Sequence, residues 1–160
     1  MKEYYWDDTG FIYLDRNMLE SINFSLVDID TLSKEGLPAW VAPNINFDIY
    51  DVVGQSLKLG EDRDDNDIFI SLPGHIVYVG HPKLVMNTSP VKLRATLVLY
   101  AEMVEKMYLI DQDAMINNLI NPKFIEEFKS ELGLLDPIAI QGDTFWNREI
   151  YRLFKDGKRN

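Results

Sequence analysis

The sequence predicts an α+β fold in which a central, mainly antiparallel sheet is flanked by helices and the C-terminal third is helical. Two patterns support this prediction. Short runs of β-branched and aromatic residues alternate with turn residues up to residue 87, and apolar residues recur at helical spacing from residue 90 onward. The 160 residues contain no repeat, low-complexity tract or linker, so we expect a single domain over residues 1–160.

The first expected element is a short helix that ends near Glu35. Asp28 or Asp30 can cap its N-terminus. Gly36 suits the left-handed position that follows a helix, and Pro38 cannot continue one. Because so short a helix has little stability of its own, it depends on packing against the rest of the chain.

Strands are expected in the region that follows. Apolar residues alternate with polar ones over residues 45–49, which is typical of a half-buried strand. A Pro-Gly turn separates the β-rich runs 67–72 and 76–80, which predicts a hairpin. The segments 55–60 and 83–87 each predict a further short strand.

The second half of the chain is expected to be helical. Ser89 as N-cap and Pro90 at the first helical position mark the start of a helix over 90–108. Trp146 is expected on the packing edge of the last helix. The remaining helices are expected near 112–119, over 122–132 with an end at Gly133, and over 143–154 with Asp143 or Thr144 as N-cap.

The net charge of −10 comes entirely from the first half of the chain. Residues 1–80 contain 15 acidic and 5 basic side chains, whereas residues 81–160 contain 11 of each. Such a field repels phosphate backbones, so we expect no direct contact with nucleic acid. It attracts a basic protein and speeds its capture, although acidity of this kind also simply keeps a protein soluble.

An acidic segment is the best candidate for contact with a basic partner. We expect residues 61–67 to form an exposed loop whose acidic side chains are partner-binding candidates, and Trp40, between two prolines, to be a further candidate. The alternatives are a merely solvated loop and a buried core tryptophan. The five acidic candidates are Glu61, Asp62, Asp64, Asp65 and Asp67.

Residue patterns of known catalytic or metal sites are not found. The chain has no cysteine, which excludes disulfides and thiolate sites, and it has no Gly-rich phosphate loop or Gly-x-Ser-x-Gly elbow. His75 and His81 are expected in loops rather than as a metal pair. The segment starting at Asp62 lacks the glycine and glutamate of a calcium loop, with Asp67 and Pro73 in those places. We therefore expect no metal, no cofactor and no enzymatic activity.

No apolar stretch is long enough for a membrane span, and the N-terminus does not resemble a secretory signal. The sequence therefore predicts a cytoplasmic protein without a membrane partner.

Four motifs follow one another along the chain and together cover about residues 28–154: TLSKEGLPAWVAPNINFD, DIFISLPGHIVYVG, MNTSPVKLRATLVLYAEM and LLDPIAIQGDTFW. Their residues and their order resemble the fourth group of the SUKH superfamily. Pro90 departs from the family pattern, which often has a second hydroxyl residue there. The matching residues are Leu32, Gly36, Leu37, Pro38, Ala42, Pro43, Phe47, Asn87, Ser89, Leu93, Leu97, Tyr100, Asp136, Pro137, Ala139 and Trp146.

The resemblance implies a sheet wrapped by helices and a role as a cytosolic immunity protein in bacterial polymorphic toxin systems. Such a protein binds and blocks a cognate toxin, and many of these toxins are nucleases or nucleic-acid deaminases. The family has no shared catalytic residues, so its motif positions, Asn87 among them, are expected to determine the fold. Two alternatives are a regulatory or scaffold protein-binding module of the same superfamily and a small hydrolase with an unrecognised carboxylate site.

Overall fold

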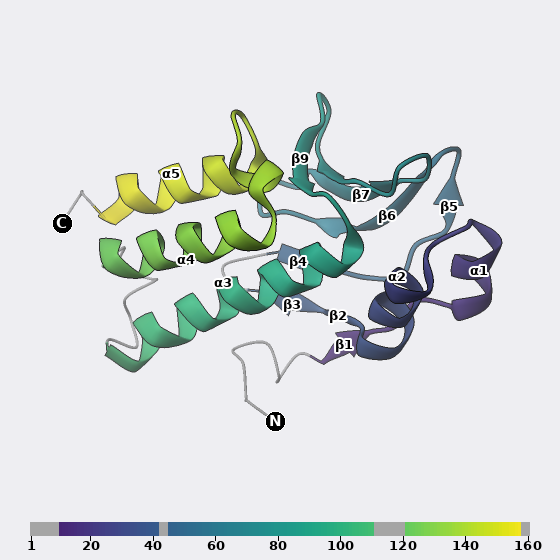
Figure 1. Cartoon of the computed structure of the whole chain (residues 1–160), viewed down its shortest axis with the longest axis horizontal. Coiled ribbons are helices and arrows are strands. Elements are labelled where there is room, and N and C mark those ends of the chain that lie inside the picture. The colour runs from purple at the N-terminus through teal and green to yellow at the C-terminus, as the bar shows by residue number, and fades with distance from the viewer. Residues whose placement is uncertain (1–9, 42–44, 111–120, 158–160) are drawn as a thin grey trace.

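The computed structural model describes residues 10–41, 45–110 and 121–157. A seven-stranded sheet lies at its centre, in the order β3-β4-β6-β7-β8-β9 with β5 paired to β6 (Figure 1). The paired strands of the described residues are antiparallel, as is a separate two-stranded sheet of β1 and β2. The strands are β1 (Phe11–Ile12), β2 (Leu37–Pro38), β3 (Trp40–Val41), β4 (Ile45–Phe47), β5 (Val52–Val53), β6 (Ser56–Glu61), β7 (Asp67–Ser71), β8 (Val77–Val79) and β9 (Leu84–Asn87).

Three long helices follow the sheet along the chain and lie side by side, whereas two short helices lie at the opposite end of the molecule (Figure 1). One cluster of buried apolar side chains joins the sheet to both groups of helices. The α+β class, with its antiparallel sheet and helical C-terminal part, is thereby confirmed. The helical elements are α1 (Arg16–Ser21), α2 (Leu26–Asp30), η2 (Thr31–Glu35, a π-helical turn), α3 (Pro90–Ile110), α4 (Pro122–Leu135), η3 (Pro137–Ile140, a 3-10 turn) and α5 (Phe145–Gly157).

No helix within the described ranges combines the length and apolar character that a membrane crossing requires.

The predicted short helix ends at Glu35 as expected, but its N-cap prediction was wrong. Ser25 is the cap, and its hydroxyl oxygen accepts the backbone N–H of Asp28 at 3.2 Å. A hydroxyl on extended backbone one residue before the helix satisfies this N–H better than an acid within it. Gly36 follows with φ +76°, and a Cβ there would lie 2.6 Å from the carbonyl oxygen of Ile12. Glycine is therefore required at this close approach of two chain segments.

The expected strands are present, with one correction. Strand β4 ends at Phe47, and Ile49 is 60% exposed instead of forming part of the strand. The backbone N–H of Ile49 is taken by the side chain of Asp48 at 2.8 Å, which ends the ladder. The runs over 67–72 and 76–80 form the hairpin β7–β8, and 55–60 and 83–87 correspond to β6 and β9.

The helices of the second half also agree largely with prediction. Ser89 caps α3, since its hydroxyl oxygen accepts the N–H of Lys92 at 3.2 Å. Helix α4 does not end at Gly133, which is a correction: a Cβ there would lie 2.9 Å from the side chain of Ile140, so this glycine allows η3 to pack closely. Thr144, rather than Asp143, caps α5 by accepting the N–H of residue 147 at 3.3 Å. The expected helical segment 112–119 lies outside the described residues.

Asn87 is the centre of a buried polar network. Its amide nitrogen donates to Thr96 Oγ1 on α3 at 2.9 Å and to Asp136 Oδ2, after α4, at 3.1 Å. Its amide oxygen accepts the indole N–H of Trp146 on α5 at 3.1 Å. Asp136 also accepts the backbone N–H and the hydroxyl of Thr88, both at 2.9 Å. The network thus ties α3, η3 and α5 to the last strand of the sheet.

An aromatic cluster surrounds the same point. Three aromatic rings surround the ring of Trp146. Their centroids lie 4.9 Å (Phe145), 5.4 Å (Tyr100) and 5.6 Å (Phe128) from the centroid of Trp146. Trp146 is fully buried, which confirms its expected packing role. Tilted and edge-on contacts of this kind add stability to that gained from buried area.

We expect Asn87→Ala to lower the free energy of unfolding by about 2–4 kcal/mol, because it leaves buried donors and acceptors on three elements without partners. Urea denaturation measures this loss. Asn17→Ala, at an exposed position of α1, is the control and should change stability by less than about 0.5 kcal/mol. A loss below about 1 kcal/mol for Asn87→Ala would contradict the central role of the network.

Candidate functional site

The acidic segment 61–67 comprises the last residue of β6, a tight turn over 62–66 and the first residue of β7, and the turn is built on Asp62. One carboxylate oxygen of Asp62 accepts the backbone N–H groups of Asp64 and Asn66, both at 2.9 Å. The other accepts the Asn66 side-chain amide at 3.1 Å. Asp62 is only 8% exposed, so the expectation that it lies on an exposed loop was wrong. Its carboxylate accepts three hydrogen bonds within the turn, so its role there is structural.

Glu61 and Asp67 lie opposite each other on β6 and β7 and share one counter-ion. Lys58 Nζ lies 2.8 Å from Glu61 and 3.1 Å from Asp67, and its ammonium also lies over the ring of Tyr50. The hydrogen bond to Glu61, followed by that to Asp67, raises the pKa of Lys58 above its ordinary value. These two acids are therefore partly neutralised within the sheet.

Asp64 and Asp65 are the two exposed acids of the turn. The side chain of Asp64 is 72% exposed, and its nearest cation is Arg63, at 3.9 Å. Asp65 is exposed at the tip of the turn with φ +60°, a conformation that Asp tolerates better than most residues. Of the five acidic candidates, these two present the most carboxylate surface to a partner.

Trp40 lies on β3, apart from the tip of the turn. It is half-buried against the core, and its register partner on β4 is Asn46, which in turn lies opposite Glu61. Register thus places Trp40, Glu61 and Asp67 in one row on the same face of the sheet. The predicted residues therefore divide between this row and the β6–β7 turn.

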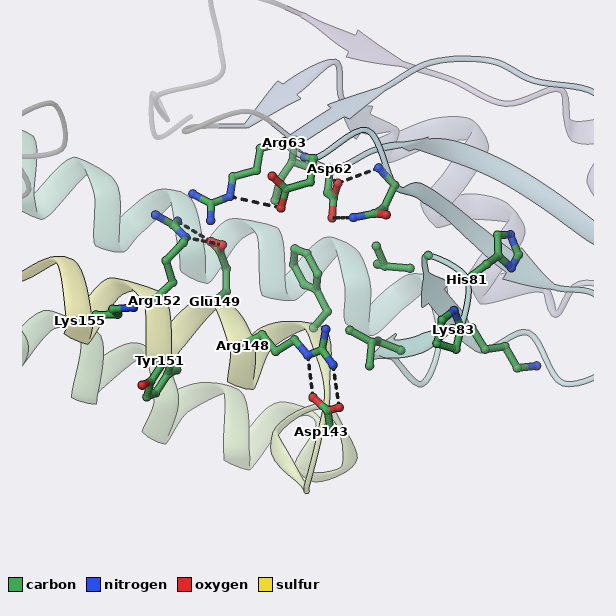
Figure 2. A pocket seen from close by; sticks show the side chains of 18 residues that line it. Asp62, Arg63, His81, Lys83, Asp143, Arg148, Glu149, Tyr151, Arg152 and Lys155 are labelled. Carbon is green, nitrogen blue, oxygen red and sulfur yellow. Dashed lines mark hydrogen bonds and ion pairs between the residues drawn. The ribbon is translucent and has the colours of Figure 1, made fainter.

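A groove of about 780 Å³ separates the β6–β7 turn from α5 (Figure 2). Asp62, Arg63 and Asp64 line one wall, and Arg148, Glu149, Tyr151, Arg152 and Lys155 of α5 line the other. Ile45, Val79, Leu84 and Phe145 give it an apolar component, and the β8–β9 turn with His81 and Lys83 lies at one end. The acidic turn is thus one side of a larger concave surface.

The sequence analysis missed the α5 wall. Its signal was present, since Arg148, Arg152 and Lys155 recur at intervals of four and three residues and therefore share one face of a helix. The sequence does not show that this face lies opposite a turn some 85 residues earlier.

Two bidentate ion pairs order the α5 wall. Arg148 donates two hydrogen bonds to Asp143, at 2.7 and 2.8 Å, and Arg152 donates two to Glu149, at 2.9 and 2.6 Å. The pair with Arg148 lowers the pKa of Asp143 and raises that of the guanidinium. Glu149 is 8% exposed, so its negative charge is held in place by Arg152.

Tyr100 lies buried behind this second ion pair. Burial raises the pKa of its hydroxyl, with a further contribution from the charge of Glu149, so the group stays protonated. The hydroxyl has no hydrogen-bond partner among the described residues. The charged side chain of Arg152 compensates it in part, since this group acts to lower the pKa of the hydroxyl.

The groove combines ion-paired acids with arginine, tyrosine and apolar side chains. A catalytic general acid needs a raised pKa, whereas that of Asp143 is lowered. Among the described residues, no three His, Cys, Asp or Glu side chains are grouped as metal ligands, and the two histidines stack on different rings, His75 on Phe24 and His81 on Phe69. Arginines, an exposed tyrosine and an apolar floor are typical of protein interfaces.

We expect Asp62→Asn to lower the free energy of unfolding by about 1–3 kcal/mol, because an amide nitrogen would replace an oxygen that accepts hydrogen bonds in the turn. Asp65→Asn, which removes the same charge at the tip, should change it by less than about 0.5 kcal/mol. Thermal and urea unfolding compare the two variants. Equal stability of both would show that Asp62 does not anchor the turn.

Tyr100→Phe should leave the free energy of unfolding unchanged or raise it by up to about 1 kcal/mol, because it removes a buried hydroxyl without a partner. Urea denaturation at neutral pH tests this expectation. A loss of more than about 1 kcal/mol would mean that the hydroxyl makes a stabilising hydrogen bond.

Comparison with protein-family models, with curated proteins and with solved structures finds no match to this chain.

Proposed function

We propose that this chain is a cytoplasmic immunity protein that binds and neutralises a cognate bacterial toxin. The observation that supports the proposal is the acidic β6–β7 turn, which presents Asp64 and Asp65 on a rigid frame anchored by the buried Asp62. A preordered turn loses little conformational entropy when a partner binds. The order of the four SUKH-like motifs supports the same function.

The charge of the chain indicates what kind of toxin it would meet. Enzymes that act on nucleic acids expose basic surfaces to the phosphate backbone. A chain of net charge −10 with two exposed acids at a projecting tip complements such a surface and attracts it over long range. The adjoining groove, with its arginines and the 70% exposed Tyr151, provides the short-range contacts.

Coexpression tests the function in cells. The genes adjacent to that of the chain are first searched for a toxin. The chain is then produced together with the toxin domain so identified, and growth is compared with that of cells producing the toxin alone. We expect restored growth and a complex that elutes as one peak in size-exclusion chromatography. Continued growth arrest despite soluble production of both proteins would refute the proposal for that toxin.

The double variant Asp64→Asn/Asp65→Asn should slow association with this toxin about three- to tenfold at low salt and flatten the salt dependence of the rate, since exposed charges act mainly on association. Stopped-flow or surface plasmon resonance measures the rate. Asp48→Asn/Asp51→Asn removes two exposed acids from the β4–β5 loop and is the matched control. Equal association rates for the two double variants would show that the turn is a solvated surface with no specific role in binding the toxin.

A further inference from the structure

The side chains that line the groove carry a slight excess of positive charge, whereas the chain as a whole is strongly negative. Its lining includes five Lys or Arg side chains and four Asp or Glu side chains, in a chain of net charge −10. Three of the cations, Arg63, Arg152 and Lys155, gather at the end of the groove where the β6–β7 turn approaches α5 (Figure 2). We infer that this end of the groove binds a carboxylate of an acidic segment of the partner protein, an inference that rests on the proposed function.

Most of the acidic groups in the groove already have partners. Asp62 accepts three hydrogen bonds inside its own turn. Asp143 accepts two hydrogen bonds from the guanidinium group of Arg148. Glu149 is bound by Arg152 in the same bidentate way. Asp143 is exposed but already paired, so an incoming cation would find Asp64 as the exposed carboxylate of the groove without a close ion pair among the described residues.

The cations are less fully compensated. The only ion pair of Arg63 within the described residues is the 3.9 Å contact with Asp64, which is too long for a hydrogen bond. Lys155 is exposed and makes no ion pair with the part of the chain that the structure describes. Figure 2 shows Arg63 extending from the turn towards Arg152 and Glu149. A carboxylate placed there can accept hydrogen bonds from Arg63 and Lys155 while the Glu149–Arg152 pair stays intact.

The partner would then meet two signs of charge a short distance apart. Asp64 and Asp65 at the outer tip attract a basic patch, and the groove accepts an acidic side chain next to that patch. Opposite charges in a fixed arrangement determine register and reject partners with the wrong pattern. A uniformly basic protein would be attracted to this surface without fitting the groove.

Two short peptides test the inference without any toxin. The isotope-labelled full chain is titrated with acetylated hexaglutamate and, separately, with acetylated hexalysine, and amide shifts are followed by NMR at low salt. We expect hexaglutamate to shift the amides around Arg63 and along 148–155, and hexalysine to shift those of Asp64 and Asp65. The inference would be overturned if hexaglutamate shifted only amides outside the groove. It would also be overturned if inorganic phosphate saturated the amides around Arg63 and along 148–155 at a lower concentration than hexaglutamate does.

Arg63→Gln/Lys155→Gln should weaken hexaglutamate binding at least fivefold and bring a comparable loss of affinity for the toxin. Lys123→Gln/Lys129→Gln removes the same charge from the exposed face of α4 and should change neither affinity by more than twofold. Circular dichroism verifies that both double variants are folded. Equal peptide binding by the two would refute the groove assignment.

The two proposals fail in different ways. If the wild-type chain neutralises the toxin and Arg63→Gln/Lys155→Gln binds it equally well, the groove inference is wrong and the proposed function stands. If hexaglutamate binds the groove as expected but the toxin is not neutralised, the proposed function is wrong and the carboxylate site stands.

Discussion

The hydrogen bonds of Asn87 hold together the parts of the chain on which the groove depends. A single buried amide joins the last strand to α3, to the segment after α4 and to the indole of Trp146 at the start of α5. Because Trp146 fixes the beginning of α5, it also fixes the helix that carries Arg148, Arg152 and Lys155. The charged wall of the groove is therefore positioned from within the core.

The second wall is positioned by a different and purely local device. Asp62 organises the β6–β7 turn through hydrogen bonds to residues two and four positions later, and the strands on either side are held in register by the sheet. The groove thus lies between a turn whose shape is set locally and a helix whose place is set by long-range contacts. Both walls are ordered before any partner arrives, which favours specific binding.

Local features were predictable from the sequence, and long-range ones were not. Ser89 and Pro90 mark the start of α3 because capping depends on adjacent residues, and the Pro-Gly turn defines the hairpin β7–β8 for the same reason. The sequence does not reveal that Gly133 lies inside α4 against the side chain of Ile140, so it suggested a helix end instead. Nor could it distinguish Asp62, buried by its own turn, from the exposed Asp64 and Asp65, because all belong to one acidic run.

The two faces of α5 are subject to different constraints on sequence change. Trp146, Ile150 and Leu153 point into the core, whereas Tyr151 and Lys155 line the groove and are exposed. Substitutions on the exposed groove face leave the packing that keeps the helix in place largely undisturbed. If the proposed function holds, the specificity of this protein could change through the outer face of α5 while the stability of the fold is kept.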